Sequence, residues 1–368
     1  MTRARDLGVP FGGEPGPLNA ITDVPGVAVG HRTLISGSGP RRLGEGPVRT
    51  GVTAILPRGA THDPVYAGWY ALNGNGEMTG TTWIEESGFL ETPVVLTNTH
   101  SVGVARDAVV RWYVREGLIG DGRDLLFGLP VAAETFDGRL NDIDGFHVTA
   151  EDVIRTLDAA EPGPVAEGNV GGGTGMICHG FKGGIGTASR RVPIGTETYS
   201  LGVLVQANYG AFEDLTIAGV PLAAEIPAPP RPDPAPRSGA PGDGSIIVVI
   251  ASDAPLLPHQ LKRLCRRAPM GIARTGGIAS NGSGDIFVAF STANPGLAKA
   301  EAPAAAETLP NNLMDGLFRA TIQATEEAIV NAMVAAEDMT GADDVTVVAL
   351  PHAALRAALG RYNRLTGT

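Results

Sequence analysis

The chain has 368 residues, of which 43% are hydrophobic and only 18% are charged, a balance typical of a folded globular protein rather than a disordered one. Its 28 Lys and Arg against 39 Asp and Glu give a formal net charge of −11, which argues against a nucleic-acid partner because phosphate binding needs a basic surface. No apolar run approaches the ~20 residues of a membrane span, and the first residues lack the apolar region of a secretory signal. We therefore expect a cytoplasmic protein without a membrane partner.

Strand and helix patterns are mixed along the chain without the strict alternation of a doubly wound fold, which favours a layered α+β architecture. Short β-branched runs bounded by Gly, Pro or Asn predict strands at Val27–Gly30, Val52–Leu56, Val94–Thr97, Tyr199–Gln206, Ile246–Ala251, Ile286–Ser291 and Val345–Leu350. Capping residues and apolar residues at helical spacing predict helices at Val102–Glu116, Ala150–Ala160, Pro258–Arg267 and Asn312–Met339.

Glycine supplies 51 of the 368 residues, about twice the average share of ~7%. It is clustered, which indicates tight turns or backbone that approaches another segment closely. The clusters are Gly74–Gly80, Gly168–Gly175, Gly180–Gly186 and Gly271–Gly284. The run Gly171–Gly175 matches neither the P-loop nor the dinucleotide-binding pattern, and Lys182 is out of register with it, so we expect no nucleotide cofactor.

The cysteines and histidines give no sign of a metal site. Cys178 and Cys265 are the only cysteines, too few for a disulfide scaffold, and we expect both to be buried free thiols. The seven histidines never approach a compact ligand spacing, so neither a metal nor another cofactor is expected. A catalytic triad built on histidine stays open, because triad members need not be neighbours in sequence.

A proline-rich stretch at Ile226–Gly244 separates two parts of the chain, and Ser245 follows it directly at the start of a strand that is apolar at every position. Composition alone favours an ordinary interdomain linker. The alternative is a self-cleaving junction between Gly244 and Ser245. Cleavage there would give Ser245 a free α-amino group, whose reference pKa of ~7.7–8.0 suits it to accept the proton of the serine hydroxyl.

Ser283 and Asp285 stand two residues apart just before the predicted strand Ile286–Ser291. If that strand starts early, the two side chains share one face, where a hydroxyl and a carboxylate could relay protons for a nucleophile on a neighbouring strand. The same residues are equally typical of an ordinary turn rich in Ser, Asn, Gly and Asp.

The chain resembles the family of L-aminopeptidases/D-esterases, which includes the β-peptidyl aminopeptidases. The shared motifs cover nearly its whole length and comprise Ile21–Val27, Val29–His31, Gly51–Thr53, Asn73–Gly80, Leu96–Gly103, Glu134–Gly138, Asn169–Met176, Val205–Asn208, Gly244–Ser245 and Ser283–Asp285. This resemblance implies a single precursor of 368 residues, cleaved before a serine into an α chain of residues 1–244 and a β chain of residues 245–368. It also implies a four-layer αββα sandwich like that of N-terminal-nucleophile hydrolases, and tetramers of αβ units.

The resemblance also implies roles for individual residues. Ser245 matches the new N-terminal nucleophile, Ser283 its serine partner and Asp285 the acidic residue two positions on. Other members carry glutamate where this chain has Asp285, which is one methylene shorter. Asn208 matches the asparagine whose side-chain amide helps to form the oxyanion hole.

Two more residues are assigned to the substrate by the same resemblance. Glu134 matches an acid that receives the free amine of the substrate. Phe136 stands where some members carry a tyrosine thought to assist the tetrahedral intermediate, so this chain lacks that hydroxyl.

The sequence therefore predicts an autoprocessed serine aminopeptidase that acts on peptides, amides or esters with a free amine through an acyl-enzyme. One alternative is a self-processing acyltransferase like the ornithine acetyltransferases, although those enzymes cleave before threonine. A second alternative is a non-catalytic ligand-binding protein with the same fold. The preferred N-terminal residue and its stereochemistry are open from sequence alone.

Overall fold

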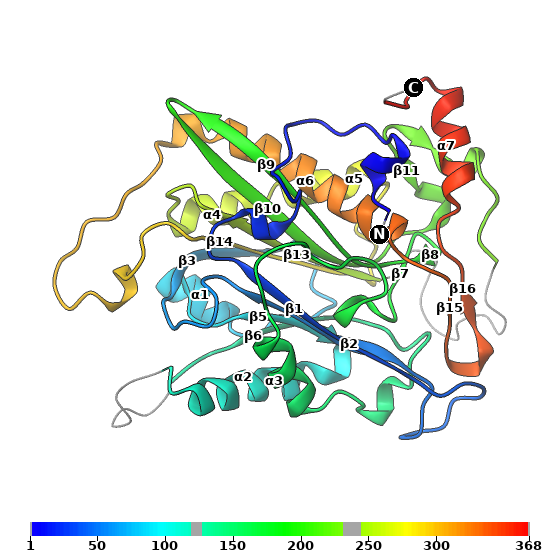
Figure 1. The fold of residues 1–368 in the computed structure, drawn as a ribbon, viewed down its shortest axis with the longest axis horizontal. Helices are drawn as coiled ribbons and strands as arrows, with labels where there is room; N and C mark the ends of the chain where they lie inside the picture. Colours follow the sequence, from blue (N-terminus) through cyan, green and yellow to red (C-terminus); the bar gives the residue numbers. More distant parts are fainter. Residues whose placement is uncertain (1, 119–126, 231–243, 367–368) are drawn as a thin grey trace.

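Two β-sheets lie face to face at the centre of the protein, in a computed structural model that describes residues 2–118, 127–230 and 244–366 (Figure 1). In these residues the larger sheet has six strands, in the order β4 (Phe89–Leu90), β3 (Val65–Ala71), β14 (Gly284–Ser291), β13 (Ser245–Ser252), β10 (Glu197–Asn208) and β9 (Gly184–Ile194). The smaller sheet has four, in the order β1 (Ala28–Ser36), β2 (Val48–Leu56), β5 (Val94–Asn98) and β6 (Val131–Thr135).

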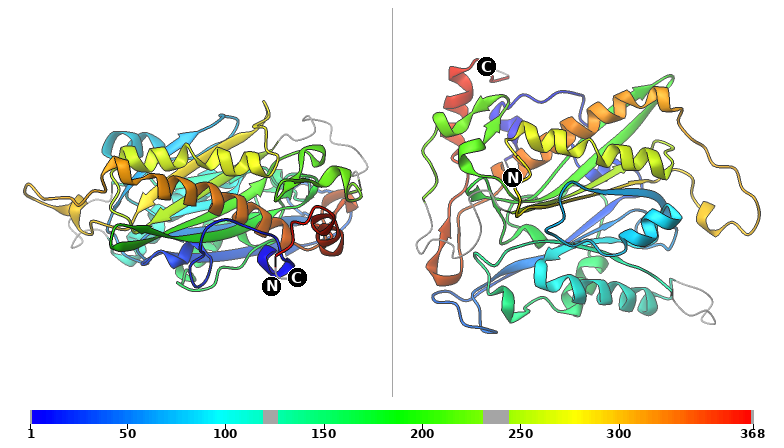
Figure 2. Two further views of the ribbon diagram at one scale, coloured as in Figure 1. Left: turned by 90° about the horizontal axis from the view of Figure 1, so that it is seen from above. Right: turned by 180° about the vertical axis from the view of Figure 1, so that it is seen from behind.

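Helices cover the outer face of each sheet. The six-stranded sheet packs against α4 (Pro258–Cys265), α5 (Ala268–Arg274) and α6 (Asp315–Val334), and the four-stranded sheet packs against α2 (Val102–Glu116) and α3 (Ala150–Asp158). The view from behind shows the same succession of helices, sheet, sheet and helices (Figure 2). The fold is therefore the four-layer αββα sandwich that the resemblance implies. Two further helices, α1 (Thr81–Ser87) and α7 (His352–Arg361), lie at its periphery.

The strand β13 shows why this chain forms layers. Ile246 and Val248 face the α4–α6 helices, whereas Ile247 and Val249 face the second sheet, and all four side chains are fully buried. A strand that is apolar on both sides needs cover on both sides, which is what the continuous apolar run in the sequence indicated. Among the residues described, no helix is long and apolar enough to cross a membrane.

Most predicted elements are present, some of them with shifted ends. The helix predicted at Val102–Glu116 has those bounds and ends at Gly117, whose φ of 59° is left-handed. The helix predicted from Ala150 begins there, where the Thr149 hydroxyl accepts a hydrogen bond from the Asp152 N–H. Cys178 and Cys265 are buried and free, as predicted.

Two predicted elements are partly wrong. The helix predicted at Asn312–Met339 is a shorter α6, and Leu313 lies before it with 43% of its surface exposed. The strand predicted at Val345–Leu350 is reduced to the two residues of β16 (Thr346–Val347), which forms a two-stranded sheet with β15 (Met339–Thr340). Beyond β16, the Val348 carbonyl accepts a hydrogen bond from the Lys182 N–H of a neighbouring hairpin, and the Ala349 N–H donates to the Asp338 side chain.

Glycine allows α6 to approach the sheet closely. A Cβ placed on Gly186 of β9 would lie 1.9 Å from the Ala328 carbonyl oxygen of α6, a separation that no side chain tolerates. The cluster Gly180–Gly186 therefore includes a position where backbone packs on backbone, as clustered glycine predicted.

Elements on either side of Ser245 interlock in the sandwich. β13 begins at Ser245 and β14 follows it in sequence, yet both lie between β10 and β3, which precede Ser245. Of the predicted linker Ile226–Gly244, residues 231–243 lie outside the described residues. Ile226 itself is 6% exposed and belongs to the core rather than to an extended linker.

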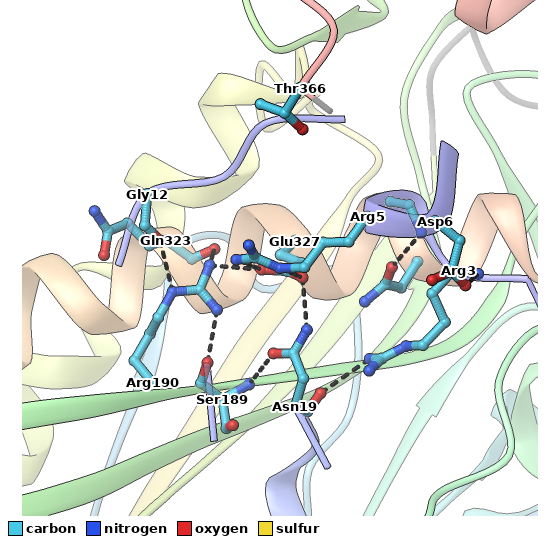
Figure 3. A network of polar contacts seen from close by, with 12 residues as sticks. Arg3, Arg5, Asp6, Gly12, Asn19, Ser189, Arg190, Gln323, Glu327 and Thr366 are labelled. Atoms are coloured by element: carbon cyan, nitrogen blue, oxygen red, sulfur yellow. Dashed lines mark hydrogen bonds and ion pairs between the residues drawn. The ribbon is translucent and has the colours of Figure 1, made fainter. Parts of the chain in front are cut away.

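A buried ionic cluster, which we call the charged clamp, joins the start of the chain to α6 (Figure 3). It consists of Arg5, Asn19, Arg190 and Glu327. The Glu327 carboxylate accepts hydrogen bonds from both guanidinium groups and from the Asn19 amide, at 2.6–2.8 Å. The clamp therefore ties residues that precede Ser245 to a helix that follows it.

Candidate active site

Ser245 is the first residue of β13 and lies at the end of the six-stranded sheet. It is paired in register with Asn208 of β10 on one side and with Gly284 of β14 on the other, and it is only 6% exposed. The Gly284 N–H donates to the Ser245 Oγ at 3.1 Å and lies 3.3 Å from the Gly244 carbonyl oxygen. One backbone donor thus contacts both the serine hydroxyl and the carbonyl of the preceding peptide bond.

Ser283 and Asp285 form a buried hydroxyl–carboxylate pair beside Gly284. The Ser283 Oγ donates to the Asp285 Oδ1 at 2.6 Å, and the two residues are 2% and 1% exposed. Burial raises the pKa of the Asp285 carboxyl, while the hydrogen bonds from Ser283 and Asn73 oppose that rise. The prediction that the two side chains share one face required the strand to begin before Ile286, and β14 begins at Gly284.

The pleat of the sheet separates this pair from the serine hydroxyl. Side chains two residues apart in a strand point to the same face of the sheet. Ser245 therefore points to the same face as Ile247, toward the second sheet, whereas Asp285 points to the same face as Phe287, toward the helices. The pair and the hydroxyl therefore lie on opposite sides of the Gly284 backbone.

The loop that follows β3 holds the pair in place, through residues that sequence reasoning did not single out. The Asn73 Oδ1 accepts from the Asp285 N–H at 2.6 Å, and its Nδ2 donates to the Asp285 Oδ2 at 3.2 Å. Asn75 donates through its side chain to the Gly282 carbonyl at 2.7 Å. The glycine cluster Gly74–Gly80 and the motif Asn73–Gly80 were the only sequence signals of this loop.

Asn208 is the last residue of β10, and both ends of its side-chain amide are anchored. Its Oδ1 accepts from the Ile177 N–H at 2.8 Å, and its Nδ2 donates to the Phe136 carbonyl at 3.0 Å. These two backbone partners fix which atom is oxygen and which is nitrogen. Nδ2 carries two hydrogens, so a second N–H remains for another acceptor beside Ser245.

Glu134 lies near the end of β6 in the other sheet and is 3% exposed. Its carboxylate accepts from the Glu77 N–H at 3.0 Å and from the Thr99 hydroxyl. Burial raises its pKa, and these two hydrogen bonds counteract the rise. A Cβ on Gly76 would lie 3.3 Å from the Glu134 Oε1 and 3.1 Å from the Gly284 Cα, so a single glycine separates this acid from the strand beside Ser245.

Phe136 follows β6, and its backbone and side chain differ in setting. Its carbonyl anchors the Asn208 amide, whereas its side chain is largely exposed, with 52% of the residue accessible to solvent. The ring packs over Gly138, where a Cβ would lie 2.4 Å from the Phe136 Cζ. A tyrosine at this position, as in some members of the family, would therefore carry its hydroxyl at the surface of the site.

The predicted residues thus come together at one end of the sandwich, from both sheets and from both sides of Ser245. In the part of the chain that the structure describes, the hydrogen-bond partners of Ser245, Ser283 and Asp285 include no histidine. Within the same residues no three His, Cys, Asp or Glu side chains gather as metal ligands would. The geometry provides a hydroxyl, a nearby backbone donor, an anchored amide and two buried carboxyl groups.

Solved structures with this architecture are close relatives of the chain. The L-aminopeptidase D-Ala-esterase/amidase of Ochrobactrum anthropi superimposes with a TM-score of 0.91 at 51% identity, over 100% of both chains. That enzyme is described as a prototype of the serine aminopeptidases and as a variant of the Ntn hydrolase fold. A β-aminopeptidase from Burkholderia sp. superimposes with a TM-score of 0.87 at 49% identity, over 98% of this chain and 99% of that one. The fold therefore defines an Ntn-hydrolase-like serine peptidase.

The sequence comparisons specify the family. The beta-peptidyl aminopeptidase BapA of Sphingosinicella microcystinivorans is 55% identical over 373 aligned positions, which span 99% of this chain and 93% of that protein. The model of peptidase family S58 matches residues 19–347. The chain belongs to peptidase family S58.

Proposed function

We propose that the protein is an aminopeptidase that cleaves itself between Gly244 and Ser245 and then uses Ser245 as its nucleophile. Membership of peptidase family S58 and the aminopeptidase relatives support the hydrolysis of peptide bonds. The observation that carries the self-cleavage is the Gly284 N–H, which contacts the Ser245 hydroxyl and the carbonyl of the bond before it. A nucleophile and a polarised carbonyl held together make an intramolecular attack favourable.

Maturation follows from that placement. The Ser245 Oγ attacks the Gly244 carbonyl carbon, the C–N bond to Ser245 breaks, and the nitrogen takes the hydroxyl proton to become a free amine. Water then hydrolyses the resulting ester, which frees the serine hydroxyl and leaves a carboxylate on Gly244. Gly244 suits this attack because its Cβ position lies 2.1 Å from the Asn208 carbonyl oxygen, so a side chain has no space there.

Turnover repeats the same chemistry on a substrate. The Glu134 carboxylate binds the substrate's ammonium group, and the Ser245 hydroxyl attacks the carbonyl of the N-terminal residue. We assign the base to the α-amine of Ser245, because the Ser283–Asp285 pair lies across the Gly284 backbone and is better placed to hydrogen-bond that amine. The Asn208 amide and the Gly284 N–H hold the oxyanion. The amine returns the proton to the leaving nitrogen, and water releases the acyl group.

The substrate class is a small peptide, amide or ester with a free amine. Relatives named as acting on β-peptides and on D-alanine esters make β- and D-residues candidates for the N-terminal position. We also propose that four cleaved units assemble into a tetramer and that the protein is cytoplasmic. Size-exclusion chromatography with light scattering measures the mass of the assembly. The acyltransferase alternative predicts transfer of the acyl group to an added amino acid rather than to water.

Denaturing electrophoresis with N-terminal sequencing tests the proposal directly. Active protein should give two chains of 244 and 124 residues, since 368 − 244 = 124, and the smaller should begin at Ser245. A free-amine amino acid p-nitroanilide should be hydrolysed by this material. A single full-length band from fully active protein contradicts the proposal.

A further inference from the structure

Lys182 is a fully buried lysine to which the proposed mechanism gives no role. It lies in β8 (Phe181–Lys182), which forms a two-stranded hairpin with β7 (Ile177–Cys178), and its exposed fraction is 0%. The Nζ donates to the carbonyls of Met176 at 2.6 Å, Gly183 at 3.0 Å and Gly173 at 3.4 Å. These three acceptors use all three hydrogens of an ammonium group.

Among the described residues, the hydrogen-bond acceptors of the Lys182 Nζ are backbone carbonyls and none is a carboxylate. A cation buried without such a partner is costly, so its retention calls for a reason. The reason lies in the acceptor at 2.6 Å. The Met176 carbonyl belongs to the same peptide group as the Ile177 N–H, and that N–H donates to the Asn208 Oδ1 at 2.8 Å.

We propose that Lys182 is a positioning residue that polarises and orients the Asn208 amide through the Met176–Ile177 peptide. This inference rests on the proposed role of Asn208 in holding the oxyanion. A cation at the carbonyl end of a peptide draws electrons toward the oxygen and makes the N–H at the other end a stronger donor. A stronger bond to Oδ1 polarises the side-chain amide in turn, so its Nδ2–H becomes a stronger donor to a developing oxyanion.

The surroundings of Lys182 act on its charge in both directions. Burial lowers the pKa of Lys182 to about 7, whereas the Asp137 carboxyl and the Cys178 thiol raise it, and three carbonyl acceptors around the Nζ favour the ammonium form. Asp137 follows Phe136, whose carbonyl anchors the other end of the same amide. The Asn208 amide thus lies between a peptide polarised by Lys182 and a segment that carries a buried acid.

The test is a double-mutant cycle on the mature enzyme, with Lys182→Met, Asn208→Ala and the double variant assayed on one free-amine p-nitroanilide. Lys182→Met should lower kcat about tenfold with little change in KM, a part of the ~10²–10³-fold expected when the donor itself is removed. In the Asn208→Ala background the same change should alter kcat by no more than about twofold, because its route to the oxyanion is gone.

Lys182→Gln provides a second variant if Lys182→Met does not fold, since its amide keeps a donor for the Met176 carbonyl but carries no charge. It should mature, retain the melting temperature within a few degrees and still lose kcat. Wild-type kcat in a folded Lys182 variant overturns the inference, as does an equal loss in both backgrounds. A near-normal kcat in Asn208→Ala alone instead contradicts the proposed oxyanion role, so the two failures are distinguishable.

Discussion

The Ser245 end of the sandwich and the charged clamp are both polar clusters that join residues before Ser245 to residues after it, yet the pKa values of their carboxyl groups shift in opposite directions. In the clamp, the guanidinium of Arg5 and that of Arg190 lower the pKa of Glu327 despite its burial. At the Ser245 end, burial dominates and raises the pKa of both Glu134 and Asp285.

The opposite pKa shifts indicate different roles for the two clusters, one in holding the chain together and the other in chemistry. Glu327 has cationic partners within its own network, so its charge is compensated and its interactions serve to hold the chain together. Among the described residues, the donors to the Glu134 and Asp285 carboxyl groups are all neutral, so no guanidinium compensates either charge. Perturbed carboxyl groups of this kind are typical of functional sites.

Of the variants that distinguish the two clusters, Ser245→Ala should have the largest effect on activity. This variant should stay as one chain of 368 residues and have no peptidase activity, while its fold and the clamp are unchanged. Ser245→Cys should cleave and turn over poorly. Electrophoresis and circular dichroism check both variants, and a cleaved Ser245→Ala protein removes this serine from the role of nucleophile.

Breaking the clamp should affect stability and leave chemistry intact. Glu327→Gln leaves two buried or half-buried guanidinium groups without their counter-ion, and we expect a loss of about 3–5 kcal/mol in the free energy of unfolding. Urea denaturation of the variant in the uncleaved Ser245→Ala chain measures it. Because the pKa of Glu327 is lowered in the folded state, its contribution is present above the unfolded pKa and is lost as pH falls through the folded pKa.

Glu326→Gln is the matched control for the clamp. Glu326 is the neighbouring residue of α6 and pairs with Arg274, which is half exposed, so its loss should cost no more than about 1 kcal/mol. Equal destabilisation in the two variants contradicts the clamp's role. A kcat lowered tenfold or more in cleaved Glu327→Gln also does so, because it couples the clamp to catalysis.

Removing the anchored amide should do the reverse and impair chemistry without unfolding the protein. Asn208→Ala should lose about 10²–10³-fold in kcat, with a smaller change in KM because the oxyanion exists only beyond the ground state. Self-cleavage is intramolecular and needs to occur once, so substantial cleavage should still be seen after hours. Kinetics and electrophoresis on one preparation decide between this outcome and a purely structural role, in which folding, cleavage and turnover fail together.

The sequence predicted the layers better than the edges of the sheets. Runs such as Ile246–Ala251 are apolar at every position and identify central strands, because side chains on both faces of such a strand have to be buried. By contrast, β6 is rich in alanine, and β9 begins with Gly-Ile-Gly and, before its last three residues, carries two adjacent arginines, one of which, Arg190, is buried in the clamp. Neither strand has the β-branched pattern on which strand prediction depends.

The site was predictable only where its residues are close in sequence or carry a family motif. Ser283 and Asp285 are two residues apart, so one strand suffices to bring them together. Asn73 meets Asp285 across 212 residues, and Ile177 meets the Asn208 side chain across 31 residues, so the order of the strands decides both contacts. No spacing rule in a single sequence reports that order.

The smallest effect we predict concerns Glu134, and it distinguishes a binding carboxylate from a structural one. Loss of a charge-assisted contact of about 1.5–3 kcal/mol should raise KM for free-amine substrates about 10–100-fold in Glu134→Gln, without blocking maturation. N-acetylated substrates should be poor for the wild type and insensitive to this change. Asp144→Asn, an exposed acid paired with His100, is the control for a general effect of charge.

The pH dependence gives the decisive form of this test. Because burial raises the pKa of Glu134, the carboxylate is lost as pH falls through a value above that of an ordinary glutamate, and an uncharged acid cannot attract an ammonium group. The ratio of kcat/KM for free-amine to N-acetylated substrates should therefore decline on acidification. The pKa of Asp285 is also raised, but its titration should affect the hydrolysis of both substrates equally and so cancel in the ratio. Glu134→Gln should make the ratio independent of pH, and a ratio that still declines in that variant would assign the amine contact to another acid.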